Sequence, residues 1–192
     1  RTAHLLESRL GVDVIMTRNR DIFVPLRDRA ALANRENADL FLSIHANAAP
    51  NNYSKGIETY SLASATDANA ARVAARENAM AKGWSDKSDP VLGRLLAAGT
   101  DRLSRELAFE VQRAVVDELR EVYPDAEIVD LGTKTALFYV LVSTRMPAIL
   151  FEASFVSNAD DERRLRTPHF QQTTASAIVD AVEQWMARQS SQ

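Results

Sequence analysis

The chain has 192 residues, of which 46% are hydrophobic and 26% charged, which suits one globular domain with a buried core and excludes a disordered or low-complexity chain. Its formal net charge of -3 offers no basic surface to phosphates, and no apolar run reaches the roughly 20 residues of a membrane span, so we expect neither a nucleic acid partner nor a membrane span. Because Cys is absent, any metal ion must be held by His and carboxylate side chains.

The first third of the chain alternates helix and strand signals. Residues 1–10 are typical of the end of an amphipathic helix, and the apolar residues of 12–16 predict a short strand after it. A proline at a first helical turn opens a helix over 25–37. Two apolar runs bounded by turn residues, 38–46 and 56–63, predict the next two strands.

Composition changes over 64–99, where alanine dominates and a polar stretch separates two helix signals. The first helix is expected to begin near Thr66 or Asp67, and a second, short helix is expected over 90–98. We therefore interpret 64–99 as a helical insertion into the domain.

The remaining chain returns to alternating elements, which are, in order, a helix over 101–122, strands at 127–131, 136–142 and 146–152, a short helix capped by Ser157 or Asn158, and a last helix from Pro168. This alternation predicts an α/β fold with a mostly parallel or mixed central sheet, flanked by helices and carrying the helical insertion.

Two polar residues stand where predicted strands end, His45 after 40–44 and Glu152 after 147–151. Ligand sites of open α/β sheets gather at the carboxyl ends of strands. Either residue alone is more often structural than functional, but a carboxylate after five apolar residues carries a desolvation cost unless a cation or a proton partner meets it. The pair is therefore a candidate site.

The chain contains four sequence blocks in a characteristic order, TRNRDIFVPLRDRAALAN at 17–34, ADLFLSIHANA at 38–48, LGTKTALFYVL at 131–141 and PAILFEASFVSN at 147–158. Together these blocks resemble the catalytic domain of zinc-dependent N-acetylmuramoyl-L-alanine amidases of the amidase-3 type. The resemblance covers almost the whole chain, 1–192. It implies a peptidoglycan hydrolase that is exported to the periplasm or the cell wall.

The resemblance also implies the chemistry of the site. One Zn²⁺ ion is held by two His and one Glu, with water at the open position; His45 is then a zinc ligand and Glu152 the catalytic carboxylate. Zinc lowers the pKa of its water and polarises the amide carbonyl, and Glu152 moves the water proton to the departing amine. The bond hydrolysed joins N-acetylmuramic acid to the L-alanine of the stem peptide.

The family's other two ligands, a His in a D-P-G-H-G-G block and a Glu at the start of the first helix, would precede Arg1. The chain begins there in sequence that already has a helical pattern, so we expect the N-terminal strand and the start of the first helix to lie upstream. His4 and Glu7 are expected to be surface residues of this helix.

The insertion suggests regulation. On a helical wheel Glu77 lies in the middle of an apolar alanine face, with Arg72 and Arg76 pointing the other way. The ARENA block at 75–79 resembles part of a helix that plugs the active site of some family members until an activator protein displaces it. This implies that Glu77 occupies the open position of the zinc. The alternative is that Glu77 pairs with an arginine of the domain or stays solvated.

Further residues have open roles. Asn47, two residues after His45, is expected to orient the site or to touch substrate, and Lys134 is a candidate for a substrate carboxylate. Glu58 is expected either to face outward or to support the site. Two other functions stay open: a catalytically silent peptidoglycan-binding or regulatory module, and a hydrolase that uses His45 and Glu152 as an acid–base pair without metal.

Overall fold

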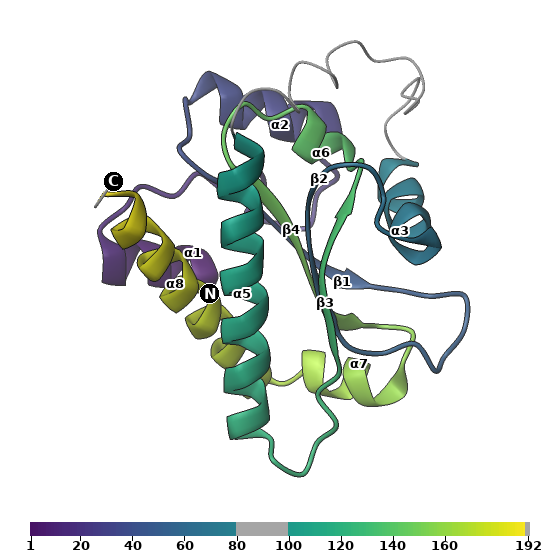
Figure 1. Ribbon diagram of the computed structural model, residues 1–192. Coiled ribbons are helices and arrows are strands. Elements are labelled where there is room, and N and C mark those ends of the chain that lie inside the picture. Colours follow the sequence, from purple (N-terminus) through teal and green to yellow (C-terminus); the bar gives the residue numbers. More distant parts are fainter. Residues whose placement is uncertain (80–99, 191–192) are drawn as a thin grey trace.

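The computed structural model describes residues 1–79 and 100–190, which form a four-stranded sheet with helices on both faces (Figure 1). The strands are β1 (Phe41–Asn47), β2 (Ile57–Leu62), β3 (Asp130–Ala136) and β4 (Ala148–Phe155). Their order in the sheet is β1-β4-β2-β3. Strand β1 is parallel to β4 and β2 to β3, whereas β2 and β4 are antiparallel. The predicted mixed α/β sheet is therefore confirmed.

The helical elements of the described residues are α1 (Thr2–Leu5), the π-helix η1 (Leu6–Leu10), α2 (Leu26–Arg35), α3 (Ala68–Asn78), α5 (Thr100–Val122), α6 (Tyr139–Val142), α7 (Ala159–Leu165) and α8 (Pro168–Gln189). Side chains of α5 and α8 form one core cluster with the sheet, and those of α2, α3 and α6 form a second one on the other face. The start of α3 follows the prediction, since the side chain of Asp67 caps the helix by accepting from the Ala70 N–H.

Successive side chains of β4 point to opposite faces of the sheet. Ile149, Phe151 and Ala153 lie in the core cluster of α5 and α8, whereas Ala148 and Leu150 lie in that of α2, α3 and α6. Successive residues of a strand point to opposite faces, so Glu152 shares the second face with Leu150. The alternation of the strand thus aims the carboxylate of Glu152 toward α3.

The strand predicted at 12–16 is wrong, because no described residue of this segment is in a strand. Val12 and Val14 pack against the core, while Ile15 and Met16 are 49% and 56% exposed. The apolar alternation correctly indicated one buried side, but a strand also needs a neighbour to share its hydrogen bonds.

The strand predicted at 136–142 is also wrong. Strand β3 ends at Ala136, and Tyr139–Val142 form the helical turn α6, with Val140 and Leu141 buried. A short apolar run cannot distinguish a strand from a buried helical turn. Of the strand predicted at 127–131, only the last two residues belong to β3. The short helix predicted at 90–98 lies outside the described residues.

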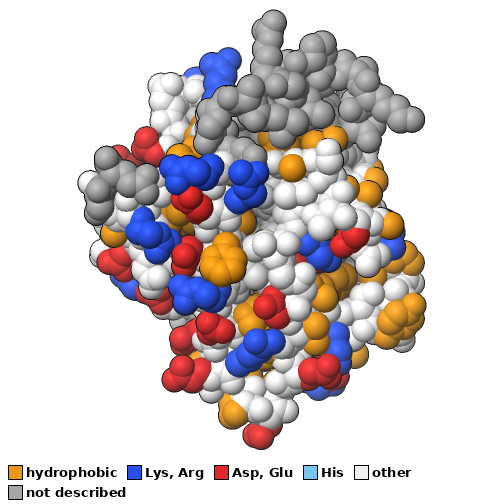
Figure 2. All heavy atoms as spheres, viewed as in Figure 1, with side chains coloured by type: hydrophobic (Ala, Val, Ile, Leu, Met, Phe, Trp, Pro, Cys, Tyr) orange, Lys and Arg blue, Asp and Glu red, His pale blue; other side chains and the backbone are white. Residues whose placement is uncertain are grey.

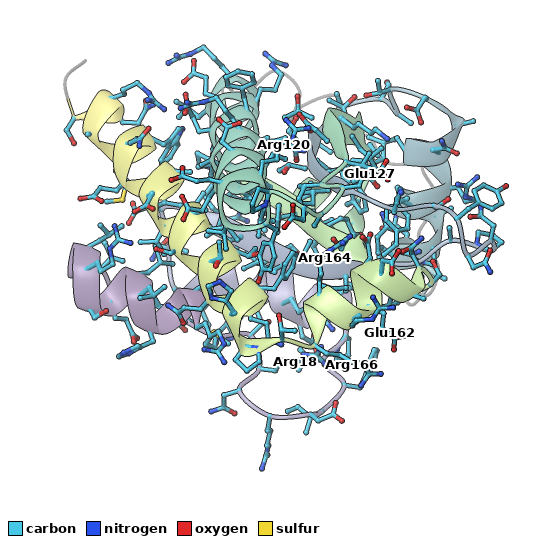
Figure 3. All side chains as sticks on the ribbon, turned by 90° about the horizontal axis from the view of Figure 1, so that it is seen from below. Arg18, Arg120, Glu127, Glu162, Arg164 and Arg166 are labelled. Carbon is cyan, nitrogen blue, oxygen red and sulfur yellow. The ribbon has the colours of Figure 1, made fainter. Side chains whose placement is uncertain are left out.

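A buried aspartate joins the loop before β2 to the end of β4. Asp161 is 1% exposed and accepts hydrogen bonds from the backbone N–H groups of Gly56 and Phe155, both at 3.0 Å. Arg164, labelled on α7 in Figure 3, donates to the same carboxylate. These contacts fix where β2 begins.

Gly56→Ala is expected to destabilise the protein by about 3 kcal/mol, because Gly56 has φ +115° and an added Cβ would lie 2.7 Å from the Val129 carbonyl oxygen. The matched control is Gly132→Ala, where φ is +73° but nothing lies within 4 Å of the added Cβ, so a loss of about 1 kcal/mol is expected. Urea unfolding measures both variants. Equal losses would contradict the steric argument.

Surface charge is mixed on the described part of the face in Figure 2, where Lys and Arg side chains lie among Asp and Glu side chains. None of the described helices combines the length and the apolar character that a membrane crossing requires.

Candidate metal centre

Three side chains from separate elements converge on the face of the sheet that α3 covers. His45 comes from β1, Glu152 from β4 and Glu77 from the last turn of α3, and one ligand atom from each lies within 4.8 Å of the others. His45 and Glu152 are direct register partners of the parallel pair β1/β4. The sheet therefore brings together both residues that the sequence singled out, and α3 adds the third.

Glu152 is a buried carboxylate to which no described residue donates a hydrogen bond. It is 0% exposed, and neither oxygen has a hydrogen-bond partner among the described residues. The guanidinium of Arg76 forms an ion pair with it at 3.8 Å. Burial, together with the charge of Glu77, raises the pKa of Glu152 to about 9. An unsatisfied carboxylate in this position favours a bound cation.

The imidazole of His45 lies between two oxygen atoms. Its Nδ1 is 3.1 Å from Oε2 of Glu77, and its Nε2 is 3.1 Å from Oγ of Ser43. The hydrogen bond from His45, assisted by Arg76, lowers the pKa of Glu77 to about 2. Glu77 is therefore ionised where it contacts His45.

Arg76 lies in the site, which corrects the expectation that it points away. Its guanidinium donates to Glu77 Oε1 at 2.9 Å and to the carbonyl oxygen of Ala48. The helical wheel located the Cα correctly as off the apolar face, but the long Arg side chain can reach around the helix. The position of Arg76 next to Glu77 in the sequence was the signal that could have placed its guanidinium in the site.

The donor set fits a metal ion. One imidazole and two carboxylates supply nitrogen and oxygen ligands that suit Zn²⁺, and both oxygens of Glu152 are available to a cation. His4 on α1 and Glu7 on η1 are exposed, as predicted, and neither belongs to this cluster.

A family model for N-acetylmuramoyl-L-alanine amidases, the amidase-3 family, matches residues 1–184. The chain belongs to this family. It is 33% identical over 183 residues to the N-acetylmuramoyl-L-alanine amidase AmiA of Escherichia coli, covering 90% of this chain and 60% of AmiA. It is 32% identical over 191 residues to AmiC of another E. coli strain, covering 97% of this chain and 45% of AmiC.

The chain shares its fold with solved N-acetylmuramoyl-L-alanine amidases. The crystal structure of an N-acetylmuramoyl-L-alanine amidase from Clostridium difficile 630 is 27% identical and superposes with a TM-score of 0.70, covering 97% of this chain and 78% of that chain. The chain thus spans about 60% or less of the two curated E. coli relatives but most of this solved amidase.

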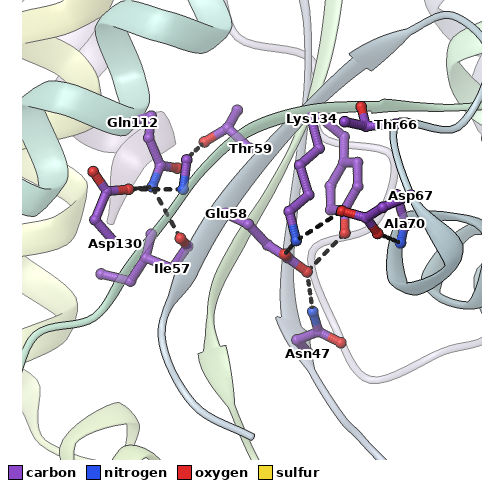
Figure 4. A network of polar contacts seen from close by, with 12 residues as sticks. Asn47, Ile57, Glu58, Thr59, Thr66, Asp67, Ala70, Gln112, Asp130 and Lys134 are labelled. Atoms are coloured by element: carbon purple, nitrogen blue, oxygen red, sulfur yellow. Dashed lines mark hydrogen bonds and ion pairs between the residues drawn. The ribbon is translucent and has the colours of Figure 1, made fainter.

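The other predicted site residues of this amidase-family chain form a neighbouring network (Figure 4). Asn47 is fully buried and its amide donates to Glu58 Oε1 at 2.7 Å. Lys134 donates to Glu58 Oε2 at 2.8 Å, so its charge is paired within the protein. Glu58 itself is 2% exposed, which excludes the outward-facing alternative.

Proposed function

We propose that the chain is a zinc-dependent N-acetylmuramoyl-L-alanine amidase, which hydrolyses the amide between N-acetylmuramic acid and the L-alanine of peptidoglycan stem peptides. The observation that carries the proposal is Glu152, a fully buried carboxylate beside His45 that accepts no hydrogen bond from the part of the chain that the structure describes. Membership of the amidase-3 family, and the activity in the names of the relatives, support the substrate.

The residues would divide the chemistry as follows. His45 would hold zinc, which would supply Lewis-acid polarisation of the amide carbonyl and a water of lowered pKa. Glu152 would take the proton of the attacking water on a carboxylate oxygen as the new C–O bond forms. It would then pass this proton to the alanine nitrogen as the C–N bond breaks. The apolar walls around Glu152 strengthen its interaction with any nearby charge.

We further propose that α3 inhibits the enzyme. Glu77 contacts His45, and Arg76 ties the same turn of α3 to the end of β1 through Ala48. In this position Glu77 would occupy the place of the catalytic water on the metal. An activator protein would have to displace the described part of the insertion 64–99 to open the site.

The proposed substrate also implies where the enzyme works. Peptidoglycan lies outside the cytoplasmic membrane, so we propose that the protein is exported to the periplasm or the cell wall. Peptidoglycan and the activator are then its partners.

Metal removal tests the activity. Dialysis against a chelator is expected to reduce release of stem peptides from purified peptidoglycan to background, and added Zn²⁺ is expected to restore it. Cleaved peptides are quantified by chromatography in the wild type and in Glu77→Ala. The variant is included because the proposed inhibition by α3 would lower the basal rate of the wild type. Hydrolysis that resists the chelator would indicate the metal-free acid–base pair. No hydrolysis in either zinc-loaded protein would indicate the silent module.

A further inference from the structure

Two buried carboxylates face each other across the antiparallel strands β2 and β4. Glu58 and Glu152 are direct register partners, 2% and 0% exposed. Residues directly opposite in an antiparallel pair project from the same face of the sheet. The chain therefore places a second carboxylate beside the candidate metal ligands, although it is not one of the three that converge.

These two carboxylates differ in the hydrogen bonds that they accept. Glu152 accepts no hydrogen bond from a described residue. Glu58 accepts three: its Oε1 receives Asn47 Nδ2 and the Tyr60 hydroxyl, each at 2.7 Å, and its Oε2 receives Lys134 Nζ at 2.8 Å (Figure 4). Burial and the charge of Glu58 raise the pKa of Tyr60, so the hydroxyl stays a donor.

Lys134 is the only one of these three donors that carries a charge. Its side chain is 13% exposed and lies on β3, in register with Tyr60 of β2. A second carboxylate, Asp67 at the N-cap of α3, lies 3.9 Å from its Nζ. Because Glu58 is closer and buried, the ammonium group chiefly neutralises Glu58.

We propose that Lys134 is a positioning residue of the metal site, which neutralises Glu58 and so keeps this carboxylate from binding the cation. Glu152 is then the buried carboxylate beside His45 that stays able to take the proton of the attacking water. The bound Glu58 in turn holds Asn47, whose Oδ1 accepts the Ala48 N–H at the end of β1. This inference rests on the proposed zinc enzyme.

A merely structural ion pair and a charge-setting pair make different predictions for cation affinity. If the pair only supports the fold, loss of either partner loosens the site, and both changes weaken zinc binding. If the pair sets the charge of the site, the two changes have opposite signs. Loss of Lys134 leaves a negative charge that attracts the cation, whereas loss of Glu58 leaves a positive charge that repels it.

Zinc affinity of the protein, measured by competition with a chromophoric chelator, tests the inference without any use of activity. Glu58→Gln is expected to weaken zinc binding about tenfold and Lys134→Met to strengthen it about tenfold, with the double variant within about threefold of the wild type. In hydrolysis assays Lys134→Met is expected to lower kcat, because the carboxylate of Glu58, no longer neutralised, would then compete with the attacking water for the ion. The double variant is expected to restore kcat in part.

One control and one replacement variant make the result decisive. Arg9→Met removes a positive charge from an exposed ion pair with Asp180, on the opposite face of the sheet, and is expected to leave the affinity unchanged. Lys134→Gln keeps a donor for Glu58 without the charge, and it replaces Lys134→Met if that variant does not fold. Weaker zinc binding in both single variants, or no change in either, would overturn the inference. Zinc binding with the expected signs but no hydrolysis would instead overturn the proposed amidase function.

Discussion

Glu152→Gln is expected to lower peptidoglycan hydrolysis by about a thousandfold, because the amide cannot accept a proton and general-base catalysis typically contributes factors of this order. The substitution keeps the size of the side chain, which is fully buried, so the packing of β4 should persist. Peptide release from purified peptidoglycan gives the rate, measured with zinc present and with Glu77→Ala in both proteins, so that the proposed inhibition does not hide the loss. Activity within about tenfold of the wild type would contradict the role of Glu152 as base.

Stability of the metal-free protein gives an independent check of the same variant. Burial raises the pKa of Glu152 from 4.5 to about 9, so above pH 4.5 the folded state keeps a proton that the unfolded state has released. Stability of the wild type should therefore fall as the pH rises from about 4.5 to 9, by at most about 1.4 kcal/mol per pH unit from this group. Glu152→Gln removes this dependence and should be the more stable protein at pH 8. Parallel pH profiles of the two proteins would contradict the burial argument.

The parts of the site that could be predicted from sequence are those that depend on residues close together in the chain. His45 and Glu152 stand out because each follows an apolar run in the sequence. Both lie inside their strands rather than at the predicted ends, and parallel pairing of β1 with β4 makes them neighbours. The cap at Asp67 is local as well, since the side chain bonds a backbone group three residues away.

The remaining features depend on contacts that no local pattern encodes. The three bonds to Glu58 come from strands β1, β2 and β3, and the register of β2 against β4 decides that Glu58 faces Glu152. The position of the Arg76 guanidinium in the site depends on the conformation of a long, flexible side chain. The strand predictions for 12–16 and 136–142 were wrong for the same reason. An apolar run indicates that side chains are buried, but it does not indicate whether the backbone pairs with a neighbouring strand.

Glu77→Ala is expected to raise basal peptidoglycan hydrolysis, in the absence of any activator, by about tenfold to a hundredfold. The contact between the Glu77 carboxylate and His45 is 3.1 Å long, and a charge-assisted hydrogen bond of this kind contributes about 1.5–3 kcal/mol. Its loss would shift α3 toward the displaced state by the corresponding factor. The hydrogen bond from Arg76 to the carbonyl oxygen of Ala48 would still tie this turn of α3 to the residue after β1.

The control is Arg72→Ala on the same helix, whose side chain is exposed and lies outside the site, and which is expected to leave basal hydrolysis unchanged. Zinc content measured in parallel decides what Glu77 does for the metal. If Glu77 is an inhibitory contact, Glu77→Ala is expected to increase hydrolysis while the protein keeps its zinc, because the substitution removes no ligand that activity requires. Loss of zinc without a gain in hydrolysis would instead make Glu77 a ligand that the enzyme needs, and α3 would then belong to the working site rather than to its regulation.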